Sequence, residues 1–142
     1  MYRHILIPTD GSALAEHGLT HGLALAKALG AKVSVIFVVE PFSELSGRYL
    51  EAVARYVELR KEQATSVLDR AAEAASAAGV SCETIQAENG QPHQAILAVA
   101  DDKGCDLIVM SSHGRGGLSK LLLGSVTNKV LTHAKTPVLV CH

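Results

Sequence analysis

Short, nearly unbroken apolar runs recur along the chain, and longer stretches with apolar residues at helical spacing separate them. The runs are rich in Val and Ile, which is typical of strands buried on both faces of a parallel sheet. The run at Ser81–Gln86 alternates between polar and apolar residues, which indicates an edge strand. The pattern predicts strands at His4–Pro8, Val33–Val39, Ser81–Gln86, Leu107–Met110 and Pro137–Cys141.

Turn and capping residues bound the helices that the intervening stretches predict. Ser12 lies where it can cap the first helix, and Pro92 suits the first turn of the third. Glycines follow the ends of the first two helices. Helices are expected from Ser12 to Leu29, over Arg48–Ala78, from Pro92 to near Gly104, and over Gly124–Ala134.

Two features of these helices predict how they pack. Gly18 and Gly22 lie four residues apart, so the first helix is expected to approach the sheet closely at that point. In the second helix apolar positions recur at helical spacing from Leu50 to Ala75, and the charged segment Arg60–Glu62 is expected on the solvated face.

The alternation of strands and helices predicts a single α/β domain over residues 1–142. Each connection is long enough to cross over and return to a parallel strand. The predicted fold is a doubly wound five-stranded parallel sheet with helices on both faces. In such sheets ligands bind beyond the carboxyl ends of the strands. Two loops at these ends carry polar and glycine residues, namely Pro8–Ser12 and Ser111–Gly117.

Charge and hydropathy narrow the range of partners. The formal net charge of −1 argues against a nucleic acid or an anionic membrane held by bulk electrostatics. No apolar run reaches the roughly 18 residues that a membrane-spanning helix needs. The segment MYRHILIPTDG turns polar too early for a secretory signal peptide. We therefore expect a cytoplasmic protein without a membrane span.

Cysteine and histidine spacing predicts neither a disulfide framework nor a metal site. The 3 cysteines are an odd number without a CxxC pair, which favours free thiols. His17 and His21 have the i, i+4 spacing of a chelating pair, but no HExxH arrangement or third ligand accompanies them.

The stretch after Met110 is the most informative about function. A loop with Gly114, Gly116 and Gly117 follows the buried strand, and Gly124-Ser125 opens the next helix. Glycine permits close backbone approach, and a helix N-terminus offers free N–H groups to an anion. Neither a GxxxxGK[ST] P-loop nor a GxGxxG dinucleotide motif is present. The alternative is that these are ordinary turn and cap glycines.

This stretch resembles the nucleotide-binding motif of the universal stress protein (UspA-type) family, which reads G-x-x-G, nine residues, then G-[ST]. Gly114, the nine residues Arg115–Leu123 and Gly124-Ser125 match the second part of that motif. Ser111 stands in place of its first glycine. The resemblance extends from the opening HILIPTDGS to the closing TPVLV.

The resemblance implies the strand order 3-2-1-4-5, a site for ATP with Mg²⁺, and a homodimer formed through the strand Pro137–Cys141. It places the adenine pocket at Pro8 and Val38, and the ribose and phosphates along the loop from Ser111 to Gly117 and at the following helix N-terminus. The residues expected at the site are Pro8, Thr9, Asp10, Val38, Met110, Ser111, His113, Gly114, Arg115, Gly117, Gly124, Ser125, Val126 and Thr127.

Four side chains near this site each have two possible roles. Asp10 could accept hydrogen bonds from ribose or help to hold Mg²⁺, or it could form an N-cap or Asx-turn. His113 could contact a phosphate or act as an acid or base, or it could be a structural loop residue. Arg115 and Lys120 could neutralise phosphate charge, or they could be solvated.

The expected function is that of a cytoplasmic ATP-binding stress-response protein whose conformation or partner choice depends on nucleotide. No dedicated base or arginine finger is evident, so we expect at most slow hydrolysis and do not predict an enzyme. The alternative is an interaction module of the same fold that binds no nucleotide, which Ser111 favours. An adenylate-forming or nucleotide-transferring enzyme is disfavoured because HxGH and SGGxDS motifs are absent.

Overall fold

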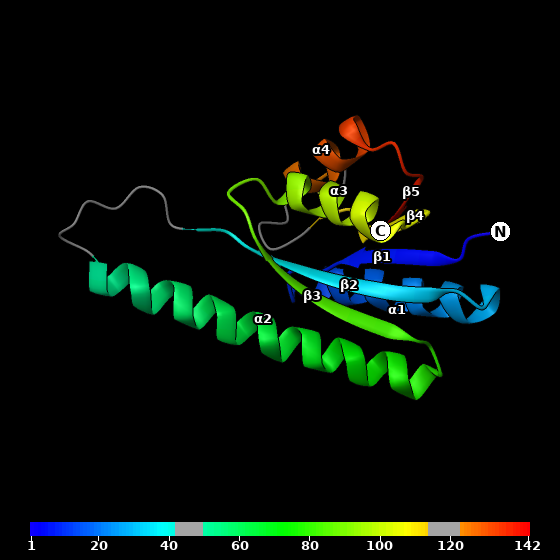
Figure 1. The fold of residues 1–142 in the computed structure, drawn as a ribbon, viewed down its shortest axis with the longest axis horizontal. Helices are drawn as coiled ribbons and strands as arrows, with labels where there is room; N and C mark the ends of the chain where they lie inside the picture. Colours follow the sequence, from blue (N-terminus) through cyan, green and yellow to red (C-terminus); the bar gives the residue numbers. More distant parts are fainter. Residues whose placement is uncertain (42–49, 114–122) are drawn as a thin grey trace.

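The computed structural model describes residues 1–41, 50–113 and 123–142 (Figure 1). Strands and helices alternate along the chain as predicted. The elements are β1 (His4–Pro8), α1 (Ala13–Leu29), β2 (Lys32–Val39), α2 (Leu50–Ala78), β3 (Cys82–Glu88), α3 (Pro92–Lys103), β4 (Leu107–Ser111), α4 (Ser125–His133) and β5 (Val138–Cys141).

The strands form one parallel sheet in the order β3-β2-β1-β4-β5, which confirms the predicted fold. The chain winds outward from β1 to β3 on one side, and then crosses back to continue through β4 and β5 on the other. The carboxyl ends of β1 and β4 therefore lie side by side at the switch in strand order, where doubly wound sheets bind ligands.

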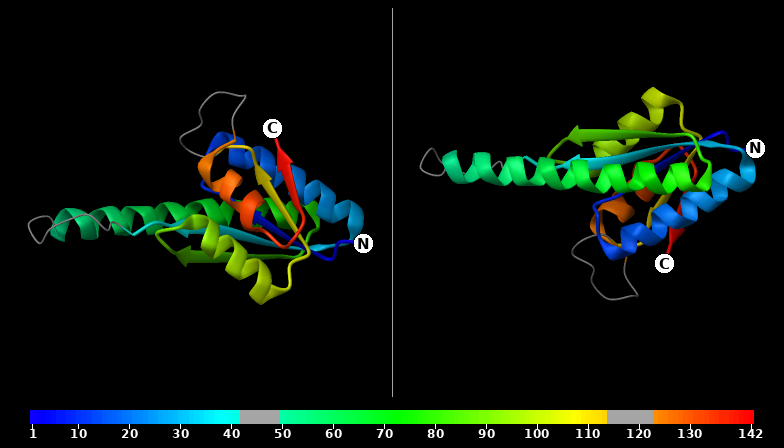
Figure 2. Two further views of the ribbon diagram at one scale, coloured as in Figure 1. Left: turned by 90° about the horizontal axis from the view of Figure 1, so that it is seen from above. Right: turned by 90° about the horizontal axis from the view of Figure 1, so that it is seen from below.

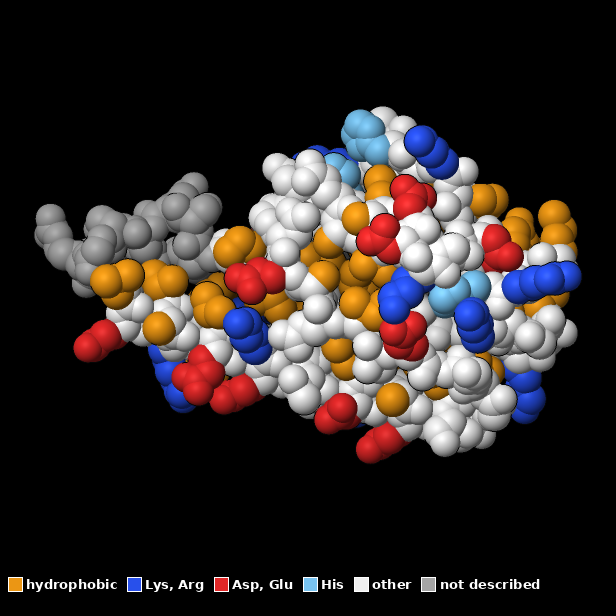
Figure 3. Space-filling view, in the orientation of Figure 1, with side chains coloured by type: hydrophobic (Ala, Val, Ile, Leu, Met, Phe, Trp, Pro, Cys, Tyr) orange, Lys and Arg blue, Asp and Glu red, His pale blue; other side chains and the backbone are white. Residues whose placement is uncertain are grey.

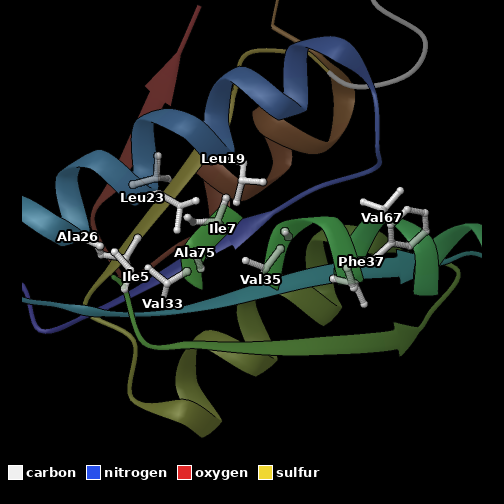
Figure 4. Packing of buried hydrophobic residues seen from close by; sticks show 14 of the residues in the cluster. Ile5, Ile7, Leu19, Leu23, Ala26, Val33, Val35, Phe37, Val67 and Ala75 are labelled. Atoms are coloured by element: carbon white, nitrogen blue, oxygen red, sulfur yellow. The ribbon is translucent and has the colours of Figure 1, made fainter. Parts of the chain in front are cut away.

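Helices cover both faces of the sheet, with α1 and α2 on one face and α3 and α4 on the other (Figures 1 and 2). Because successive side chains of a strand point to opposite faces, β1 supplies both cores. Ile5 and Ile7 pack toward α1 and α2, whereas Leu6 packs in the core on the side of α3 and α4. Figure 4 shows the first of these cores, in which Val35 and Phe37 of β2 also lie.

β3 extends further than the alternating pattern predicted. The pattern ended at Gln86, whereas β3 continues to Glu88 because its pairing with β2 continues to Val39 opposite Glu88. Backbone pairing, which the side-chain pattern does not report, sets this end. β3 is an edge strand, as predicted.

α1 lies directly on the sheet at Gly18 and Gly22, as their spacing predicted. Both glycines are buried. A Cβ atom added to Gly22 would overlap Cδ1 of Ile7, and one added to Gly18 would lie 3.1 Å from the backbone nitrogen of Ser111. The absence of a side chain at Gly18 thus lets α1 touch the backbone at the end of β4, which carries the site described below.

The first turns of α2 extend past the sheet, so the apolar positions at the start of the predicted helix are not buried. Leu50 is 67% exposed, and the buried residues of α2 begin at Ala64. A helix of 29 residues spans about 44 Å, whereas the 8 residues of β2 span about 26 Å. Figure 1 shows the start of α2 projecting beyond the sheet, and Figure 3 shows hydrophobic side chains on that segment.

A buried histidine joins β1, β2 and α3 at the amino end of the sheet. The imidazole Nδ1 of His4 lies 3.2 Å from the backbone oxygen of Lys103, and its Nε2 lies 2.7 Å from Oγ of the fully buried Ser34. The carbonyl can only accept, so Nδ1 carries the proton and Nε2 accepts from the Ser34 hydroxyl. Burial, and then the charge of Lys32, lower the pKa of His4 below its ordinary value.

We therefore expect the free energy of unfolding to fall as the pH drops below 6.5, the ordinary pKa of a histidine. The unfolded chain then binds a proton that folded His4 refuses, and this loss grows until the pH reaches the lowered pKa of the folded state. Urea unfolding at about pH 7.5 and 5.5, compared between the wild type and His4→Gln, measures it. A difference between the two proteins that does not change with pH would contradict this expectation.

Although α2 is long, neither it nor another helix within the described ranges is long and apolar enough to cross a membrane.

Candidate functional site

A cavity of about 370 Å³ lies at the carboxyl ends of β1, β2 and β4 and extends to the N-terminus of α4. Ile36 and Val38 of β2 and Met110 of β4 give it apolar walls, whereas the loop after β1 and the start of α4 give it polar ones. The predicted site residues that line it are Pro8, Thr9, Asp10, Val38, Met110, Ser111, His113, Gly124, Ser125, Val126 and Thr127. Gly114, Arg115 and Gly117, and also Lys120, lie outside the described residues.

The loop after β1 is a compact turn held by its own side chains. The amide of Ser12 donates to Oδ1 of Asp10 at 2.9 Å, and the amide of Gly11 donates to Oγ1 of Thr9 at 3.2 Å. Gly11 has a φ of 81°, which favours glycine, and a Cβ there would lie 2.7 Å from Cγ2 of Val67. Ser12, and not Asp10, caps α1, by accepting from the amide of Ala15. Asp10 therefore forms the Asx-turn and also lines the cavity.

The segment after β4 is held in place from two sides. Oγ1 of Thr127 donates to the backbone oxygen of Ser111 at 2.9 Å. The amide of Gly124 donates to the backbone oxygen of Ser112 at 2.7 Å. On the other side, the amide of Ser112 donates to the oxygen of Cys141 at the end of β5. These bonds position residues 111–113 against the first turn of α4.

Ser111 fits the position where the resembled motif has glycine. It ends β4, and no residue other than glycine has a positive φ in the described ranges, so this position makes no conformational demand for glycine. Its hydroxyl turns back to donate to the backbone oxygen of His113 at 2.6 Å. The serine therefore fixes the segment that carries His113.

The N-cap residue of α4 supplies no side-chain cap. Gly124 occupies that position with φ −63° and ψ 159°, and among the described residues no side-chain cap bonds the amides of the first turn. The first-turn amides of an α-helix have no partner within the helix because no turn precedes them. The start of α4 therefore presents N–H donors and the positive end of the helix dipole. The backbone of Gly124 is extended, a conformation open to any residue, so this position makes no conformational demand for glycine.

Arg60 of α2 also lines the cavity, so its predicted place on the solvated face was wrong. Its Cζ lies 5.4 Å from the ring centroid of the buried Phe37, and its Nη1 donates to Oε1 of Gln63 at 2.6 Å. Among the described residues that line the cavity, it is the only Lys or Arg. Arg60 lies four residues before Ala64 and seven before Val67, so it shares the inward face of α2 with these buried residues. This helical spacing in the sequence could have predicted that Arg60 lies near the site.

Sequence reasoning also missed several other cavity residues, most of which supply apolar wall. They are Ala15, Ile36, Glu40, Pro92, Ile96 and Leu123.

Comparison with known proteins identifies the family. The model of the universal stress protein family matches residues 1–142. The chain belongs to the universal stress protein family. Universal stress protein MJ0531 from Methanocaldococcus jannaschii is 38% identical to it over 141 residues, which are 99% of this chain and 82% of that relative.

Solved structures of universal stress proteins share the fold of this chain. Hypothetical protein MJ0577 is 32% identical with a TM-score of 0.79, and the match covers 99% of this chain and 95% of that one. A universal stress protein in complex with cAMP is 26% identical with a TM-score of 0.75, and the match covers 99% and 97% of the two chains.

Proposed function

We propose that this universal stress protein binds ATP at the cavity and acts as a nucleotide-dependent switch in the stress response. One observation carries the proposal: apolar walls at the ends of β2 and β4 share a cavity with the uncapped N-terminus of α4. A nucleotide has the matching division into a flat apolar base and a charged phosphate group. The volume of about 370 Å³ falls within the range of small-molecule sites.

The described residues suit the parts of a nucleotide. Val38 and Met110 offer apolar contact to a base, and the carboxylate of Asp10 offers an acceptor for ribose hydroxyls. The first-turn amides of α4 and the hydroxyl of Ser125 offer donors to phosphate oxygens. Mg²⁺ bound to the phosphates prefers oxygen ligands and waters, which Asp10 suits. The relative solved with cAMP supports an adenine nucleotide as the class of ligand.

The proposed switch needs no efficient catalysis. A ligand shifts a protein between conformations only by its difference in affinity for them. Binding of ATP would act in this way on the choice of partner, with at most slow hydrolysis. We further propose a cytoplasmic protein that forms a homodimer through the strand Pro137–Cys141. β5 is an edge strand of the sheet, and its Leu139 is 39% exposed, which supports such pairing.

The test begins with the purified protein. We expect its denatured extract to release an adenine nucleotide on anion exchange, and we expect the stripped protein to bind ATP with Mg²⁺ in calorimetric titration. GTP is the matched control, because it keeps the triphosphate and changes only the base. If no nucleotide is released and ATP does not bind, the proposed function is wrong. The chain would then be the alternative, an interaction module of the same fold.

A further inference from the structure

A pair of stacked histidines joins α3 to α4 on the outer surface of the molecule. The ring centroids of His93 and His133 lie 5.6 Å apart, and the two ring planes make an angle of 28°. His93 lies in the first turn of α3, and His133 is the last residue of α4. Figure 3 shows histidine side chains gathered on this face, over α3 and α4. Neither ring lines the cavity, so the proposed nucleotide site does not account for them.

The stack connects two helices that both wall the cavity. Pro92 and Ile96 of α3 line it, as do residues 125–127 of α4. Ile96 and Val130 are buried in the same core, and α3 packs against α4 there. His93 directly follows Pro92 in the chain. The separation of α3 from α4 at the stack therefore affects the position of the cavity wall.

Positive charge gathers at this contact when the pH falls, because histidine side chains take up a proton in mildly acidic solution. Burial, and then the charges of Lys129 and His133, lower the pKa of His93. Among the described residues no salt bridge joins any of these three side chains to a carboxylate. A single imidazolium can stack on a neutral ring, whereas two imidazoliums repel each other. Protonation of both rings therefore places three positive charges close together where α3 meets α4.

We propose that the His93–His133 stack is a proton-sensitive contact, and that protonation of both rings loosens α3 from α4 and lowers the affinity of the cavity for nucleotide. This inference rests on the proposed nucleotide site and names how that site is regulated. A group that takes up a proton less readily in the closed state than in the open state makes acid favour the open state. Nucleotide binding needs the walls from α3 and α4 together, so a pH below 6.5, the ordinary pKa of a histidine, favours release.

A variant that keeps the stacked ring but not its proton tests the proposal. Phenylalanine at position 93 can still stack on His133 but cannot take up a proton. Between about pH 7.5 and 5.5, we expect the ATP affinity of the wild type to fall about 5-fold more than that of His93→Phe. His21→Phe is the matched control, because His21 is exposed on α1 and does not line the cavity, and it should follow the wild type. Calorimetry gives the affinities, and protonation of ATP and of His4 affects all three proteins alike.

Amide hydrogen exchange of the nucleotide-free protein measures the helix contact itself. After correction for the intrinsic pH dependence of exchange, we expect the amides of α3 and α4 in the wild type to lose protection at about pH 5.5, relative to those of β1. In His93→Phe the two helices should keep their protection at both pH values. This readout does not depend on ATP, so it separates the opening of the helices from its effect on the ligand.

The outcomes distinguish the inference from the proposed function. ATP affinity that falls equally with pH in the wild type and in His93→Phe would overturn the inference and leave the proposed function in place. Equal loss of helix protection in the two proteins would also overturn it, because the protons responsible would then bind elsewhere. No ATP binding by the wild type at either pH would overturn the proposed function and this inference with it.

Discussion

Alanine in place of Phe37 is expected to lower the free energy of unfolding by about 3–5 kcal/mol, the cost of deleting a buried aromatic ring from a packed core. Phe37 is fully buried between β2 and α2, and it lies in the core shared with Val67 (Figure 4). Its ring also supports the guanidinium of Arg60 at the cavity. Removal should therefore destabilise the fold and release Arg60 from its place at the site. Urea unfolding followed by circular dichroism measures the stability.

Two companion variants separate packing from the aromatic contact. Phe37→Leu keeps most of the apolar volume and should cost less than Phe37→Ala. Arg60→Ala keeps the ring and removes the cation–π contact, which is worth about 0.5–1 kcal/mol near a surface. If Phe37→Ala cost no more than Arg60→Ala, the ring would not be part of the core.

The fold could be predicted from the sequence because its signals are local. The apolar runs at β1, β2 and β4 are buried on both faces, so each reads as a strand without knowledge of its partners. The glycine after α1 and the proline at the start of α3 mark ends that depend on backbone geometry alone. The strand order came from the resemblance to a family and not from any local signal.

The departures from prediction share one physical cause, which is that tertiary placement is not encoded in a local pattern. The periodicity of α2 gives its inward stripe, but only contact with the sheet decides which turns of that stripe are covered. Leu50 therefore proved exposed and Arg60 reached the cavity. The described candidate site residues, in contrast, lie at or just after the ends of β1, β2 and β4, or at the start of α4. Their convergence on one cavity thus followed from topology once the strand order was known.

Aspartate in place of Gly124 is expected to abolish phosphate recognition while leaving the fold intact. The backbone of Gly124, at φ −63° and ψ 159°, suits an N-cap aspartate, whose carboxylate would accept from the amides of Val126 or Thr127. The stability of the empty protein should stay within about 1 kcal/mol of the wild type or rise. The carboxylate would occupy the donors proposed for phosphate and repel it. A like charge at about 4 Å costs about 4 kcal/mol near a protein surface, so ATP affinity should fall about 100- to 1,000-fold.

Gly124→Asn is the matched control, because asparagine caps a helix about as well as aspartate but carries no charge. It should weaken ATP less than Gly124→Asp does, and the difference between the two variants isolates the charge. That difference should shrink at high salt, since screening reduces the repulsion. Adenosine should not distinguish the two variants. Calorimetry at low and high salt makes the comparison. Equal ATP affinity in the two variants would mean that the negative charge of the ligand lies elsewhere than the start of α4.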